Sequence, residues 1–378
     1  MVLQSIFHKT INSIVIDEKG NSIMKIITCA SYGASGSSAL TDLVGEYSNV
    51  HRMTDAEFRF LHDPDGISDL EFQLVECHNR HNAGRALKRF WRQCQYNAGN
   101  RIHKRYERFF DGKYRDISKK YVEKLTDFTC KGWWDFDLLD RGDKRNSYIY
   151  LKKIEDRILK AIPFTSKRVF DQEDMYYSHP SEKAFLDATR EYVHSLLSVA
   201  NKDNQEYLEV DQILPSQNID RYIRYFSDPI EVFVVDRDPR DIYVLEKVYY
   251  PIYYGSYNND SVEVFCKKFK YIRESGNINY SKSSHIHYLQ FEDFIFDYER
   301  IEKEVEEATG LKHEDHINRF QYLNPMKSVN NVQTWVEQPG LADDIRYIEE
   351  NLSDYLYPFE KHTRKEVQGI PVSDNTKF

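Results

Sequence analysis

The sequence has few cysteines and no long apolar run, and both absences exclude classes of protein. Five cysteines are spread over 378 residues without metal-ligand spacing, and their odd number favours free thiols in a reducing compartment. No apolar stretch approaches the ~20 residues of a membrane helix, so we expect no transmembrane segment. No signal peptide is recognisable at the start, and we therefore expect a cytoplasmic protein.

An excess of basic residues is also missing. Lys and Arg number 52 against 61 Asp and Glu, and the resulting net charge of -9 argues against nucleic acid as a partner. Hydrophobic residues make up 40% and charged residues 30% of the chain, as in soluble globular proteins. The length suits one large α/β domain with an insertion, or two domains, and leaves the oligomeric state open.

The most informative segment is a loop of small residues between a predicted strand and a predicted helix. The apolar run Ile26–Ala30 indicates a buried parallel strand, and the apolar spacing from Ala39 indicates a helix. Amides and short hydroxyls at such a helix start can converge on a phosphate, although an ordinary strand-to-helix turn has the same composition. The loop residues are Gly33, Ser35, Gly36, Ser37 and Ser38.

A lysine is absent from this loop, whereas a kinase-type loop has Gly-Lys followed by Ser or Thr. A second apolar run, Val232–Val235, ends at Asp236, which taken alone is a candidate magnesium ligand. However, Arg237 and Arg240 then bracket Pro239 at the carboxyl end of this predicted strand. Open α/β sheets bind ligands at that edge, and guanidinium groups pair well with phosphate. A surface turn of paired Arg and Asp side chains is the alternative.

Together the two segments resemble the sulfotransferases that use 3′-phosphoadenosine-5′-phosphosulfate (PAPS). In that family a loop of the type Pro-Lys-Ser-Gly-Thr-Thr holds the 5′-phosphosulfate, and an Arg-Asp-Pro-Arg-Asp segment holds the 3′-phosphate. The resemblance places the 5′ side on Ser35–Ser38 and the 3′ side on Arg237. It implies PAPS as co-substrate, adenosine 3′,5′-bisphosphate (PAP) as product, and no metal.

A later segment extends the resemblance. Family members carry a Lys or Ser, a loop and a Trp that close over the nucleotide, and Lys327, Asn331 and Trp335 fit that pattern. The alternative for Trp335 is an ordinary core aromatic. The apolar spacing between residues 341 and 356 predicts a closing helix. The full cofactor-site assignment is Ala34, Ser35, Gly36, Ser37, Ser38, Arg237, Arg240, Lys327, Asn331 and Trp335.

Two positions depart from the family pattern. Ala34 stands where many members have a lysine that stabilises charge on the bridging oxygen, and Leu245 stands where members often have Ser. Either another cation replaces the lysine, or the protein binds nucleotide with weakened catalysis. The candidates for replacement are Arg52, Arg59 and Lys327.

Sulfuryl transfer also needs a base to take the acceptor's proton. Some glycan sulfotransferases use a Glu in a segment rich in Glu and Phe after the first helix. By this resemblance Glu57 is the first choice, and His62 and His51 follow. A solvated surface carboxylate is the alternative for Glu57.

The expected organisation is a split core. An N-terminal extension covers residues 1–23, the PAPS-binding core covers 24–75 and 205–360, a helical insertion covers 76–204, and a tail covers 361–378. The fold class is α/β, with a P-loop-like parallel sheet flanked by helices. The insertion interleaves cations such as Arg85 and Arg89 with aromatics such as Phe90 and Trp91. It is interpreted as an acceptor-binding lobe or, alternatively, as a solvated helical surface.

The sequence thus predicts a sulfotransferase that moves a sulfuryl group from PAPS to a hydroxyl or amine. A cell-surface glycan is the favoured acceptor, and a sterol, lipid or phenol stays open. Two other classes also stay open: a P-loop nucleotide kinase, and a catalytically silent nucleotide-binding protein.

Overall fold

The computed structural model describes residues 24–53, 56–132, 134, 144–162, 173–249, 261–274 and 283–362. The expected extension at 1–23 and nearly all of the expected tail lie outside these residues. The described residues form two compact units: those up to Leu61 together with those from Val193 onward form one, and those between His62 and Tyr192 form the other.

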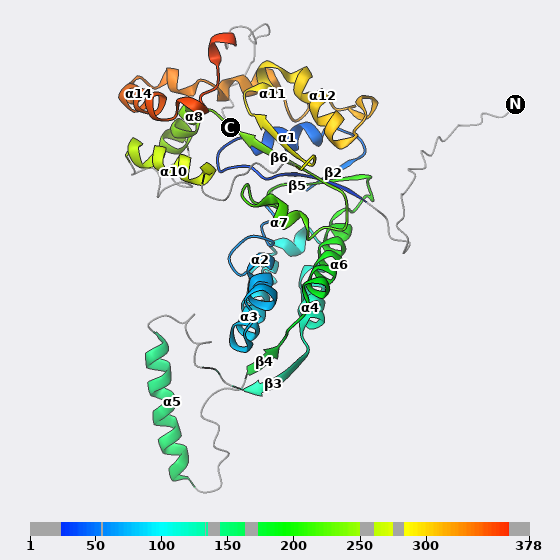
Figure 1. Ribbon diagram of the computed structural model, residues 1–378, viewed down its shortest axis with the longest axis vertical. Coiled ribbons are helices and arrows are strands. Elements are labelled where there is room, and N and C mark those ends of the chain that lie inside the picture. Colours follow the sequence, from blue (N-terminus) through cyan, green and yellow to red (C-terminus); the bar gives the residue numbers. More distant parts are fainter. Residues whose placement is uncertain are drawn as a thin grey trace, which may run out of the picture. The chain divides into compact units, whose positions relative to one another are not determined.

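A five-stranded sheet forms the centre of the first unit. Every neighbouring pair of strands is parallel, in the order β2-β5-β1-β6-β7. The parallel α/β class predicted from the sequence is therefore confirmed (Figure 1). The strands are β1 (Lys25–Cys29), β2 (Val50–Met53), β5 (Tyr207–Val210), β6 (Ile230–Asp236) and β7 (Ile286–Gln290).

Both faces of the central strands β1 and β6 are buried, which explains why these two strands are largely apolar runs. On one face, Ile27, Phe233 and Leu289 pack in a cluster with α1, α11 and α12. Residues of the opposite parity, such as Ile26 and Val232, are equally buried. The helices of this unit are α1 (Ser37–Val44), α7 (Ile219–Ile223), α8 (Pro239–Val244), α10 (Val262–Glu274), α11 (Asp293–Phe296), α12 (Tyr298–Thr309), α13 (Pro325–Ser328) and α14 (Ala342–Asn351).

A second cluster joins α8, α10 and α14 beside the sheet. Ile242 of α8, Phe265 and Phe269 of α10, and Ile345 and Ile348 of α14 form it. The closing helix predicted from the apolar spacing is thus present as α14. Its packing against α8 fixes the segment that follows β6.

The second unit is mainly helical. Tyr121 of α4 and Tyr192 of α6 stack with their ring centroids 4.4 Å apart, and Phe90 of α3 meets both rings edge-on. The strands β3 and β4 pair antiparallel, and β4 packs on α3. The elements are α2 (Ile67–Glu71), α3 (Arg80–Ala98), α4 (Tyr114–Leu125), β3 (Phe128–Gly132), α5 (Lys144–Ala161), β4 (Glu173–Tyr177) and α6 (Glu182–Ala200), which contributes residues to both units. None of the described helices is long and apolar enough to cross a bilayer.

Candidate functional site

The loop between β1 and α1 has the backbone of an anion cradle. Ala34 and Gly36 adopt left-handed conformations, with φ of 65° and 88°. A Cβ on Gly36 would overlap the ring of Phe291, so the loop can lie here only with glycine at that position. The amides of Gly36, Ser37 and Ser38 donate to no described residue. These amides at the N-terminus of α1 are therefore available to an anion.

The serines of the loop have different surroundings. Ser35 is fully buried, and its hydroxyl donates to the Tyr32 carbonyl at 2.8 Å. Ser35 therefore shapes the loop from inside. Ser37 is half-buried and Ser38 exposed, and neither hydroxyl has a hydrogen bond to a described residue. These two hydroxyls remain as donors toward a ligand.

Arg237 follows β6 and lies against the same aromatic ring as Gly36. Its guanidinium carbon is 4.7 Å from the centroid of the Phe291 ring. The side chain donates to the carbonyl of Asn331, and its Nε is buried with no hydrogen-bond partner among the described residues. Since Phe291 contacts both segments, the two motifs separated by about two hundred residues meet at one edge of the sheet.

Arg240 is held in structural interactions. It donates to both carboxylate oxygens of Asp238, at 2.9 and 2.7 Å, and to Glu349 at 2.8 Å. Its guanidinium carbon stands 4.1 Å from the centroid of Trp335, which also packs on both hydrophobic clusters. In this structure the charge of Arg240 is balanced by carboxylates, and Trp335 serves as its stacking partner.

The segment that carries Asn331 is fastened by Asp241. This carboxylate accepts from the amides of Gln333 and Thr334, at 2.9 and 2.7 Å, and from the Thr334 hydroxyl. Burial is the main cause that raises the pKa of Asp241 to about 6. Lys327 lies exposed on α13, a few residues before this segment.

Two of the three candidates for the missing loop cation, Arg52 and Arg59, are already paired with carboxylates. Arg52 forms an ion pair with Asp42, and Arg59 lies 3.5 Å from Glu57. Sequence reasoning missed Arg273 of α10, which is 5% exposed and binds both oxygens of Asp236 at 2.8 and 2.5 Å. Arg273 also stands 4.3 Å from the ring centroid of Tyr32 at the start of the loop. From the sequence alone, Arg273 is indistinguishable from any other cation in the last turn of a helix.

The three candidate bases lie in different places. Glu57 belongs to the first unit, and its side chain is 55% exposed. His51 on β2 lies 3.2 Å from Asp203, which precedes β5, so this pair is at the amino edge of the sheet, opposite the loop. His62 is partly buried and is the first residue of the second unit.

Two carboxylates at the end of β5, Glu209 buried and Asp211 partly buried, were not anticipated as site residues. Both oxygens of Glu209, and one of Asp211, are buried without a hydrogen-bond partner among the described residues. Burial and the charge of Asp211 raise the pKa of Glu209 well above its usual value. Burial, followed by the negative charge of Glu57, raises the pKa of Asp211 to about 7. Since the Phe58 amide donates to the Asp211 carbonyl at 3.2 Å, this acid lies beside the Glu57 segment.

A separate cavity of about 410 Å³ lies within the second unit, between α2 and α3. Arg89 binds Asp65 at its wall with two hydrogen bonds of 2.6 and 2.7 Å. Arg85, Asn82 and the partly exposed ring of Phe72 also line it. Carboxylates, arginines, an amide and an aromatic ring thus line the cavity together.

Comparisons with known proteins found structural likeness only. No protein-family model matches the chain, and no curated protein matches it. A sulfotransferase from Mycobacterium tuberculosis is similar over 83% of this chain and 77% of that one, with 10% identity and a TM-score of 0.34. Retinol dehydratase in complex with androsterone and the inactive cofactor PAP is similar over 88% of this chain and 82% of that one, with 13% identity and a TM-score of 0.28.

Proposed function

We propose that this chain is a PAPS-dependent sulfotransferase. The observation that carries the proposal is the meeting of the Gly36 loop and Arg237 on the ring of Phe291. The free amides of Gly36, Ser37 and Ser38 would hold the 5′-phosphate, and Arg237 the 3′-phosphate. PAPS would supply an activated sulfuryl group, and the chain would hold it in line with the acceptor.

Arg237 is 3% exposed beneath the carbonyl of Asn331. A phosphate would therefore reach this guanidinium, including its buried Nε, once the segment around Asn331 shifts outward. In this proposal residues 327–335 then close over the bound nucleotide, in the manner that the sequence resemblance implies.

The acceptor's proton would pass to Glu57. Asp211 beside it is a second candidate for the same role, because its pKa of about 7 suits proton transfer near neutral pH. In this proposal the second unit binds the acceptor, with a glycan favoured by the cations and aromatic ring of its cavity. A smaller sterol, lipid or phenol acceptor is the alternative.

Two other functions, a kinase and a catalytically silent nucleotide-binding protein, are the alternatives to this proposal. A magnesium-dependent kinase would need the carboxylate of Asp236, but Arg273 already binds both of its oxygens. A catalytically silent nucleotide-binding protein is favoured by Ala34 and by the pairing of Arg52 and Arg59 with carboxylates. Sulfuryl transfer to an acceptor distinguishes that protein from the enzyme.

Calorimetric titration with PAP, set against ATP with magnesium, tests the proposal. We expect micromolar binding of PAP in preference to ATP, and a loss of about tenfold to a hundredfold in Arg237→Gln, because a charged hydrogen-bond partner is removed. Arg346→Gln is the matched control, since that side chain is 68% exposed on α14. A preference for magnesium ATP, or no binding of either nucleotide by the wild-type protein, contradicts the proposal.

A further inference from the structure

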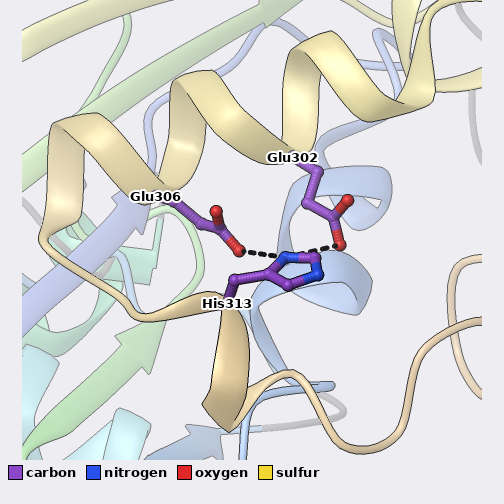
Figure 2. Close-up of side chains that lie close together, drawn as sticks. All are labelled: Glu302, Glu306 and His313. Atoms are coloured by element: carbon purple, nitrogen blue, oxygen red, sulfur yellow. Dashed lines mark hydrogen bonds and ion pairs between the residues drawn. The ribbon is translucent and has the colours of Figure 1, made fainter.

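A cluster of three potential metal ligands lies outside the proposed nucleotide site. Glu302 and Glu306 are four residues apart on α12, and so they share one face of that helix. The chain leaves α12 at Gly310 in a left-handed conformation and returns His313 toward this face. Figure 2 shows the imidazole of His313 pointing to the two carboxylates.

The spacing of these side chains is close to that of ligands around one ion. His313 Nδ1 is 3.1 Å from Glu306 Oε1 and 3.9 Å from Glu302 Oε1, and one ligand atom from each residue lies within 4.8 Å of the others. With bonds of about 2.0–2.2 Å, ligands on a tetrahedral zinc ion stand roughly 3.3–3.6 Å apart. Small side-chain rotations therefore suffice to receive an ion.

Buried groups outside the cluster orient both carboxylates. The Tyr47 hydroxyl donates to Glu306 Oε1 at 2.9 Å. Glu302 is hydrogen-bonded to His316 at 2.5 Å and to Arg319 at 3.0 Å. Outer hydrogen bonds of this kind fix metal-ligating carboxylates in place and adjust their basicity. The guanidinium of Arg319 also offsets part of the negative charge of the two carboxylates.

The cluster is closed on one side and open on the other. The side chains of Glu302 and Glu306 are 5% and 16% exposed, whereas that of His313 is 69% exposed. Glu306 Oε2 has no hydrogen bond to a described residue. An ion could enter from solvent and keep a water molecule at its open position.

We propose that Glu302, Glu306 and His313 form a binding site for a divalent transition-metal ion of the zinc type. One imidazole with two carboxylates favours zinc, cobalt or nickel over magnesium and calcium, which prefer oxygen ligands alone. The ion would join α12 to the short helix at His313–Asp315 and stabilise that turn. This inference is independent of the proposed sulfotransferase activity.

Metal titration of the chelator-treated protein tests the site. Zinc binding is measured by calorimetry, and cobalt binding by visible absorption, in the wild type, His313→Ala and Glu306→Gln. We expect the wild type to bind one equivalent of zinc at this site. The affinity for zinc should be reduced at least about tenfold in each variant. Glu314→Gln is the matched control, because that carboxylate is 78% exposed and is not a ligand.

The exposure of His313 makes misfolding of its variant an improbable cause of lost binding, and circular dichroism checks this directly. Cobalt bound through an imidazole and carboxylates would give absorption bands that disappear in His313→Ala. The same zinc stoichiometry and affinity in the wild type and both variants, or no zinc binding by the wild type, would overturn the proposal. In that case the three side chains form an ordinary ion-pair cluster.

Discussion

At the residue scale, protonation of Asp211 links the candidate site to the pH dependence of the free energy of unfolding. Its pKa rises from 3.8 in the unfolded chain to about 7 in the folded protein, chiefly because the carboxyl is buried. The folded state thus holds a proton that the unfolded state has released. The stability contribution of this group is complete below the unfolded pKa and is lost as the pH rises from about 4 to 7.

Asp211→Asn should therefore change the pH dependence of unfolding. Relative to the wild type, the variant gains stability as the pH is raised from 4 to 8, by at most about 4 kcal/mol, since each pKa unit corresponds to ~1.4 kcal/mol. Urea denaturation at several pH values measures the effect. Asp343→Asn is the control, because that side chain is 95% exposed. A parallel pH profile for the wild type and Asp211→Asn would show that Asp211 does not hold the extra proton.

At the scale of elements, the loop between β1 and α1 contains two glycines, of which one requires the absence of a side chain and the other does not. Gly36 has φ of 88° and faces the Phe291 ring, whereas a Cβ on Gly33 would meet nothing within 4 Å. Gly36→Ala should cost roughly 2 kcal/mol or more, from the left-handed backbone and the overlap with the ring, and should weaken PAP binding. Gly33→Ala should change neither quantity. Equal behaviour of the two variants in urea denaturation and in PAP titration would contradict this account.

The elements that the sequence predicts well are those with strong apolar patterns. The run at Val232–Val235 lies inside β6, and the helix expected from the apolar spacing after Ala39 is α1. The antiparallel pair of β3 and β4 is not predicted from the sequence. Nearly all of β3 is exposed, and its residues show no alternation of apolar and polar side chains. The formation of such short exposed strands depends on pairing with another strand, which the local sequence does not indicate.

The site is predicted less fully, because partners distant in sequence decide what each charged side chain does. Arg237 and Arg240 both belong to the motif, yet within the described part of the chain Arg240 is hydrogen-bonded to carboxylates and Arg237 to a backbone carbonyl. Glu209 and Asp211 alternate with apolar residues like the outer face of a half-exposed strand. Their burial follows from helices covering both faces of the sheet, which local periodicity does not reveal.

At the scale of the whole molecule, each of the two compact units has apolar packing of its own. The first is built on the parallel sheet, and the second on the stacked aromatic residues of α3, α4 and α6. Independent cores unfold as separate cooperative units when few interactions couple them. We therefore expect two transitions in scanning calorimetry of the full chain.

PAP should raise the midpoint temperature of only one of these transitions. The proposed phosphate donors, the Gly36 loop and Arg237, belong to the unit that contains the sheet, so binding stabilises that unit alone. At a ligand concentration a hundred times Kd the stabilisation is about 2.7 kcal/mol, which corresponds to roughly 5–10 °C for a unit of this size. Arg237→Gln should remove the shift and leave the other transition in place. If PAP moved both transitions equally, nucleotide binding and acceptor binding would be coupled through the whole chain, and the two units would act as one.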